Sequence, residues 1–140
     1  MIAAPLHTGT VRGAPVRFFR SPIEDGRPDM PWVAWDDLTA SFPLPAGLRD
    51  DFRRGLRAEW GDASRTVATS AGPAVVVPHF AAQGFIHAMA ECFGMDAEGD
   101  YATAGAEALE RLTAHLTFPD GVLAFSAAAL RRWDAEGGGR

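Results

Sequence analysis

The sequence predicts an α+β fold that contains two β-hairpins, a short strand and four to five helices, with the helices concentrated in the C-terminal part. Glycine-containing turns separate strand-like residues twice within the first 77 positions, whereas apolar residues at helical spacing fill most of the remainder. The 140 residues, 47% hydrophobic and 22% charged, have the composition of one globular domain. We therefore expect a single domain over residues 1–136, followed by a frayed tail at 137–140.

The N-terminal segment predicts a hairpin followed by a loop. Residues 10–12 and 15–20 flank Gly13 and Ala14, and glycine at a tight turn supplies the positive φ that hairpins need. Residues 21–31 carry three prolines and one glycine, which is the composition of a loop.

A short strand and a short helix are expected next. Residues 32–35, Trp-Val-Ala-Trp, form an apolar run that is typical of a buried strand. Asp36 or Asp37 is placed to cap a helix over residues 38–42, because a carboxylate there accepts hydrogen bonds from unpaired backbone amides. The two prolines that follow end this helix, since proline cannot continue the backbone ladder.

Residues 46–60 form the clearest amphipathic helix in the sequence. Its apolar stripe repeats every four positions and consists of Leu48, Phe52, Leu56 and Trp60. A second hairpin is expected from the strand-like residues 65–69 and 73–77, which are joined by a turn around Ala71 and Gly72.

Three further helices are expected in the C-terminal half. The first spans residues 79–93, and Gly94 is a suitable terminator. The others span residues 101–116 and 122–133, separated by a Pro-Asp-Gly break. The single cysteine, Cys92, is expected to be a small buried side chain.

Charge is distributed unevenly along the chain. All 13 basic residues are arginine, and the formal net charge is -5. Residues 1–66 contain nine arginines and nine acidic residues, whereas residues 67–140 contain four arginines and nine acidic residues. Any anion-binding surface is therefore expected in the first half, and the acidic balance argues against unspecific, charge-driven binding to DNA.

Hydropathy and cysteine usage indicate a cytoplasmic protein. The apolar runs are far shorter than the roughly 20 residues that a membrane-spanning helix needs. The first residues, Met-Ile-Ala-Ala-Pro, lack the basic start and apolar stretch of a secretory signal. A single cysteine excludes an intrachain disulfide framework and is typical of a reducing compartment.

The residues that carry catalytic or metal chemistry form no recognised motif. His87 and Cys92 are five positions apart on an expected helix, so their side chains diverge by about 140° and are poorly placed to share a ligand. No serine stands in a Gly-x-Ser-x-Gly nucleophile elbow. We therefore expect no enzyme activity, metal or cofactor. A hydrolase that uses His79 or His87 is the least favoured alternative, and an exposed imidazole beside a carboxylate in a cleft would favour it.

Arginines of the 46–60 helix are the best candidates for a binding function. Arg49, Arg53 and Arg57 recur every four residues, which places them in one row with about 6 Å between neighbours. Such a row can follow a phosphate backbone. The alternative is a solvated face of ion pairs, because Asp50 and Asp51 precede Arg53 and Arg54 at helical spacing.

The order of elements and one phrase resemble the Bro-N domain, the N-terminal part of many phage antirepressors and virus-encoded regulators. The phrase is residues 31–42, Pro-Trp-Val-Ala-Trp-Asp-Asp-Leu-Thr-Ala-Ser-Phe, and it follows a hairpin that ends in arginine and aromatic residues. A helical stretch, a second hairpin and a helix opening at Pro78 and His79 continue the similarity, which covers residues 9–93. The resemblance implies sequence-specific DNA binding or regulator binding in a phage or prophage setting, with no catalytic residues.

Two hypotheses follow for the function of the chain. The first is a non-enzymatic, Bro-N-like regulator that binds DNA, with Arg49, Arg53, Arg54, Arg57, Arg65, Arg12 and Arg17 as its candidate contacts. The second is an interaction module of antirepressor or inhibitor type whose acidic helical part, residues 95–136, binds a basic protein. The acidic candidates are Asp96, Glu98, Asp100, Glu107 and Glu110. An exposed apolar face on the last helix, around Leu130 and Trp133, would indicate a homodimer.

Overall fold

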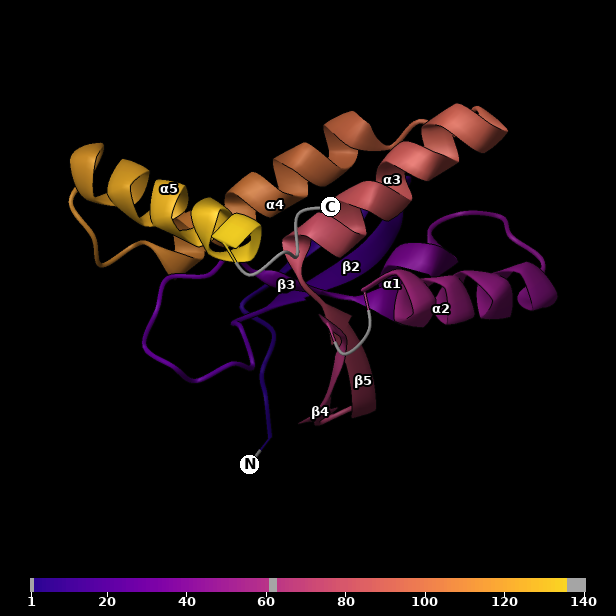
Figure 1. Ribbon diagram of the computed structural model, residues 1–140, viewed down its shortest axis with the longest axis horizontal. Helices are drawn as coiled ribbons and strands as arrows, with labels where there is room; N and C mark the ends of the chain where they lie inside the picture. The colour runs from indigo at the N-terminus through magenta and orange to yellow at the C-terminus, as the bar shows by residue number, and fades with distance from the viewer. Residues whose placement is uncertain (1, 61–62, 136–140) are drawn as a thin grey trace.

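A five-stranded antiparallel sheet is the centre of the fold (Figure 1). The structure is a computed structural model that describes residues 2–60 and 63–135, with the side chains of 2–55 and 63–132. The strands are β1 (His7–Val11), β2 (Ala14–Phe19), β3 (Trp32–Ala34), β4 (Arg65–Thr69) and β5 (Gly72–Val77). Their spatial order is β1-β2-β3-β5-β4, which confirms the two hairpins and the short strand between them.

Five helices complete the α+β fold that the sequence predicts. They are α1 (Trp35–Ala40), α2 (Ala46–Trp60), α3 (His79–Phe93), α4 (Glu98–Leu112) and α5 (Asp120–Ala135). The bounds of α2 and α3 match the expectation, and Gly94 ends α3 in the left-handed conformation with φ of 64°. The last two helices differ from it, because α4 begins and ends earlier than residues 101–116 and α5 is longer than residues 122–133. No helix in the described part of the chain is long and apolar enough to cross a membrane.

The first hairpin turns one residue earlier than the sequence suggests. Arg12 and Gly13 both have positive φ, 51° and 79°, and Ala14 already belongs to β2. Two central residues with positive φ match the right-handed twist of the flanking strands in a two-residue turn. Arg12 therefore lies in the turn itself rather than on a strand.

The expected cap of the first short helix is corrected by the structure. The helix begins at Trp35, and its N-cap is Ala34, which makes no side-chain capping hydrogen bond. Asp36 and Asp37 lie instead in the first turn, where a negative charge interacts favourably with the helix dipole. Trp32 and Trp35 are both buried, in the two apolar clusters on opposite faces of the sheet.

The two faces of the sheet carry cores of different size. One face packs against α1, α3 and α4 in a large apolar cluster that includes Phe18, Val77 and Met89. The opposite face carries a small cluster around Phe19 and Trp32, which residues of the N-terminal segment and of the 20–31 loop cover. The helices α1, α3 and α4 therefore lie together on one face of the sheet (Figure 1).

A glycine determines how closely α4 approaches the sheet. Gly9 of β1 faces Ala104 of α4, and a Cβ added at Gly9 would lie 2.5 Å from the Ala104 Cβ. Only glycine allows this approach, because real Cβ atoms essentially never come nearer than 3.0 Å. The contact sets the position of α4 beside α3.

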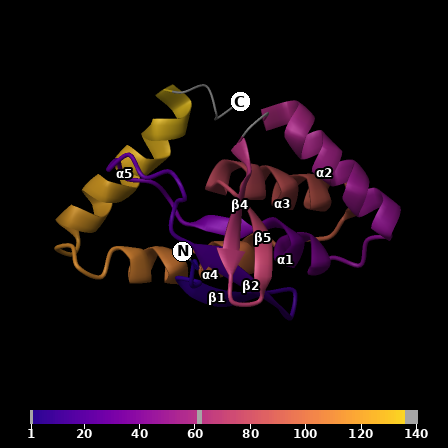
Figure 2. The same cartoon turned by 90° about the horizontal axis from the view of Figure 1, so that it is seen from below.

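The helices α2 and α5 lie at opposite ends of the molecule, with the sheet between them (Figure 2). Leu48 and Phe52 of the predicted apolar stripe pack against the core, whereas the side chains of Leu56 and Trp60 fall outside the described residues. Cys92 is exposed rather than buried. It lies on the same helical face as the buried Phe85, but in the last turn of α3, where residues 91–94 are all exposed.

Candidate binding groove and the arginine surface

Two of the three α2 arginines with described side chains are paired with carboxylates. Arg53 forms an ion pair with Asp36 of α1, and Arg54 forms one with Asp51 one turn earlier. The pairing of Asp51 with Arg54 is one of the helical pairs that the sequence indicates, whereas the pairing with Asp36 joins two helices. Both pairs reduce the positive charge that this surface offers to a phosphate.

The three candidate arginines outside α2 also have partners. Arg17 donates two side-chain hydrogen bonds to Asp37, at 2.8 and 3.1 Å, and this interaction raises the pKa of its guanidinium group. Arg12 donates to the carbonyl oxygen of Asp96 and lies over the ring of Phe42. Arg65 donates to the carbonyl oxygen of Ser64.

Arg49 is the exposed exception in the arginine row. Its side chain has no hydrogen-bond or ion-pair partner within residues 2–55 and 63–132. With Asp36, Asp50 and Arg53 it lines a shallow hollow of about 300 Å³ between α1 and α2. The fourth member of the predicted row, Arg57, has its side chain outside the described residues. A continuous cationic ridge is therefore not present among the described side chains.

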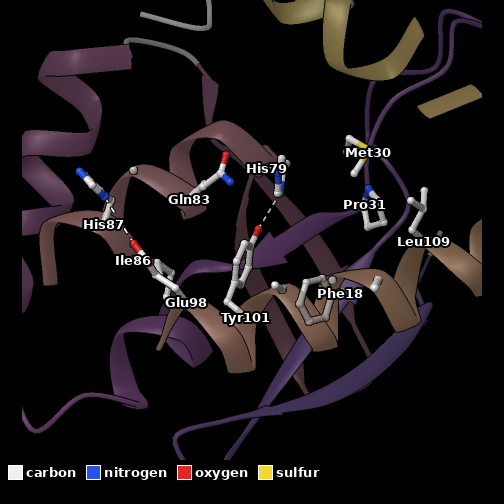
Figure 3. Close-up of a pocket in the computed structure, with 14 residues that line it drawn as sticks. Phe18, Met30, Pro31, His79, Gln83, Ile86, His87, Glu98, Tyr101 and Leu109 are labelled. Carbon is white, nitrogen blue, oxygen red and sulfur yellow. Dashed lines mark hydrogen bonds and ion pairs between the residues drawn. The ribbon is translucent and has the colours of Figure 1, made fainter. Parts of the chain in front are cut away.

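A larger concavity than this hollow lies between α3 and α4. It is a groove of about 700 Å³ that opens to solvent along the two helices (Figure 3). His87 and Glu98 lie at one end, His79 and Tyr101 in the middle, and Met30, Pro31 and Leu109 at the other end. Phe18 of β2 contributes to its floor.

Small residues keep this groove open. Gly84 of α3 and Ala102, Gly105 and Ala106 of α4 line it, and no other heavy atom lies within 4 Å of a Cβ built at Gly105. The three α4 residues recur at positions i, i+3 and i+4, which places them on one helical face. These groove residues were not identified from the sequence. Their spacing is the one sequence pattern that points to the groove, and it does so only when α3 is known to lie alongside.

His79 and Tyr101 provide a neutral polar pair in the middle of the groove. The His79 Nδ1 and the Tyr101 hydroxyl oxygen share a hydrogen bond of 2.9 Å, and their rings are stacked. Burial lowers the pKa of His79 from its ordinary 6.5, against the opposing effect of Asp29. Burial also raises the pKa of Tyr101. Both side chains are therefore uncharged at neutral pH.

The lowered pKa of His79 predicts a pH-dependent loss of stability. The unfolded chain binds a proton near pH 6.5, whereas the folded chain resists it, so this contribution to stability is complete above pH 6.5 and declines as the pH falls toward the folded value. Titration of the imidazole proton resonances should give a midpoint for His79 below 6.5. A midpoint at or above 6.5 would contradict the burial of the imidazole.

The end of the groove near His87 is acidic. The His87 Nε2 lies 3.2 Å from Glu91 Oε1, and its Nδ1 lies 3.4 Å from Glu98 Oε1. All three side chains are more than half exposed. Glu98 at the groove end and Glu91, which contacts the other nitrogen of His87, attract a cation and repel a phosphate.

His87 and Glu98 are an exposed imidazole and a carboxylate at one end of the groove, which is the feature that the hydrolase alternative requires. An imidazole beside a carboxylate is the pair that general-base catalysis needs, and His87 with Glu98 has that geometry. Its exposure leaves it in water, where charges are strongly screened. Within the described residues, no group of three or more His, Cys, Asp or Glu side chains is arranged to hold a metal ion.

No family model, curated protein or solved structure compared with the chain matches it.

Proposed function

We propose that the chain is a non-enzymatic interaction module that binds an amphipathic, basic segment of a protein partner in the groove between α3 and α4. The observation that carries this proposal is the groove itself, which has a volume of about 700 Å³, a mostly apolar lining and the Glu98 carboxylate at one end, where Glu91 also contacts His87. The partner's apolar side chains would enter the groove, and its basic side chains would meet the carboxylates.

The shape of the groove favours a helical segment. Its walls are the two 15-residue helices α3 and α4, which form a hairpin joined by residues 94–97. Helix-in-groove recognition places anchors at positions i, i+3, i+4 and i+7 of the bound segment along such a trough. The small side chains at Gly84, Ala102, Gly105 and Ala106 leave room for those anchors.

Charge favours a basic partner. The half of the chain that builds the groove, residues 67–140, carries nine acidic residues against four arginines. Glu91, Glu98 and Glu110 are exposed on α3 and α4. An acidic surface steers a basic segment toward the groove and suppresses the binding of anionic competitors.

A designed peptide tests the groove directly. The probe is a fluorescein-labelled helix of about four turns with leucine at groove-facing positions and lysine elsewhere, and its control carries glutamate in place of lysine. Fluorescence anisotropy should show saturable binding of the lysine peptide and much weaker binding of the glutamate peptide. Equal affinity for both peptides, or no binding of either, would contradict the proposal.

A matched pair of glycine variants locates the binding site. Gly105→Leu places a side chain in the groove and is expected to lower peptide affinity at least about tenfold, as the loss of a central anchor position does. Gly55→Leu makes the same change on α2, where a Cβ also meets open space, and should leave affinity unchanged. Both variants should be at least as stable as the parent, because leucine has the higher helix propensity. Equal affinity in the two variants would place the site elsewhere.

DNA binding through α2 is the second candidate function. It is supported by the exposed position of Arg49, and the resemblance of residues 9–93 to the Bro-N domain implies the same activity. The surrounding carboxylates limit it to a few phosphate contacts, because Asp36 and Asp51 already hold Arg53 and Arg54.

A salt titration checks the second candidate. If α2 contacts phosphates, affinity for duplex DNA should fall steeply with salt, with a slope of about 0.9 in logarithmic units per phosphate contact. The double variant Arg49→Ala with Arg57→Ala should reduce that slope by about two contacts. No binding at about 50 mM salt, or binding that salt does not affect, would exclude this function.

A further inference from the structure

Exposed apolar side chains are concentrated on and beside α5. Five large hydrophobic residues are exposed in the described part of the chain, and three of them are Phe118, Leu123 and Leu130, with 83%, 64% and 51% of their surface accessible. The helix extends from one end of the molecule, away from α2 (Figures 1 and 2). Such a concentration of apolar surface is typical of an interaction site.

Among the side chains of α5 described up to residue 132, those docked on the rest of the molecule lie on one face. Ala129 is fully buried, and Arg132 is held by Asp25 of the 20–31 loop through two hydrogen bonds of 3.2 and 2.6 Å. Leu123, Ala127 and Leu130 follow the i, i+4, i+7 spacing of a single helical face. At 100° per residue, that face lies well away from Ala129 and Arg132, so it is directed outward.

We propose that this outward face of α5 packs against the same face of a second copy of the chain, with the two helices antiparallel about a two-fold axis. Leu123 of each copy then meets Leu130 of the other, because an antiparallel pair reverses the order of the two leucines. Ala127 lies next to the axis, where its small side chain permits close approach of the two helices. Each apolar residue therefore gains a partner from the same stripe.

Charge determines the antiparallel direction. Asp120 and Arg131 are 11 positions apart, which places them within about 20° of each other on one flank of the apolar stripe. Residues on the same flank face each other across an antiparallel pair, so Asp120 of one copy lies near Arg131 of the other. Both side chains belong to exposed residues, and the two resulting pairs are of opposite sign. A second copy of the chain thus carries the complement of this surface.

Sedimentation of the full chain tests this assembly. The parent should show a concentration-dependent rise from the monomer mass of 14.9 kDa toward twice that value. Leu123→Glu should weaken dimerisation at least about tenfold, because it places a charge in the centre of the apolar contact. A parent that stays monomeric, or a Leu123→Glu variant that dimerises as the parent does, would overturn the proposal.

Charge reversal separates the antiparallel pair from other associations. Asp120→Arg and Arg131→Asp should each weaken dimerisation, since each places like charges together, and the double variant should recover most of the parent affinity. In the double variant an arginine remains at the N-terminus of α5, where its charge interacts unfavourably with the helix dipole. A recovery of dimerisation affinity therefore cannot result from a more stable helix. A double variant that dimerises as weakly as either single variant would overturn the antiparallel arrangement. Peptide binding in the α3–α4 groove is unaffected by these outcomes.

Discussion

A Gly9→Ala variant is expected to lose about 1–3 kcal/mol of unfolding free energy, the usual cost of inserting an atom into a packed contact. The added Cβ would lie 2.5 Å from the Ala104 Cβ and 3.3 Å from the Ala104 Cα. The second of these atoms is backbone, so α4 itself must move away from β1. Urea unfolding monitored by circular dichroism gives the change directly.

A compensating substitution shows whether the clash is the cause. Ala104→Gly alone should cost about 1 kcal/mol, because glycine is a poor helix former. Combined with Gly9→Ala, it removes the opposing Cβ, so the double variant should be more stable than the sum of the two single losses implies. Strict additivity of the two losses would show that β1 and α4 do not touch as described.

The same variants link the fold to the proposed site. The α4 helix supplies Ala102, Gly105 and Ala106 to one wall of the groove. A shift of α4 away from β1 changes the width of that groove, so Gly9→Ala should weaken peptide binding and Ala104→Gly in the same chain should restore part of it. Unchanged peptide affinity in Gly9→Ala would show that the groove tolerates the shift.

A Trp32→Ala variant is expected to show the largest loss of stability, about 3–5 kcal/mol. Trp32 has no accessible surface and is the largest side chain of the core on the second face of the sheet. Its indole Nε1 also donates a hydrogen bond of 2.8 Å to the buried Asp29 carboxylate. The truncation removes both the packing and this hydrogen bond.

Trp32→Phe separates the two contributions of Trp32. It keeps an aromatic ring in the small core but deletes the indole donor to Asp29, and it should cost about 1–3 kcal/mol. Thermal and urea unfolding of both variants provide the comparison. A Trp32→Ala loss smaller than that of Trp32→Phe would contradict the buried position of this side chain.

Local signals account for the parts of the fold that the sequence predicts correctly. Turn glycines, proline breaks and the apolar spacing of α2 and α3 act over a few residues, so both hairpins and both helices are recognisable without tertiary information. The predicted start of α1 is wrong because Trp35 belongs to an apolar run that is typical of a strand. In the structure Trp35 is the first residue of the helix, and its ring packs on Phe85. Tertiary packing overrides local preference there.

The site depends on contacts that a single sequence does not contain. The ion pair between Asp51 and Arg54 follows from helical spacing and could be anticipated. The pair between Asp36 and Arg53 joins residues 17 positions apart, and it depends on how α1 and α2 are placed. The groove also depends on how two helices are placed. Gly84 and Gly105 line the same concavity only because residues 94–97 turn the chain so that α4 runs back along α3.

The most direct test of the proposed function is to map the lysine peptide onto the isotope-labelled chain by amide chemical-shift perturbation. We predict that the largest changes occur at Gly84, Ala102, Gly105 and Ala106, with smaller changes at His87 and Glu98. Perturbations concentrated on α2 around Arg49, or none at a peptide excess, would contradict a binding site between α3 and α4.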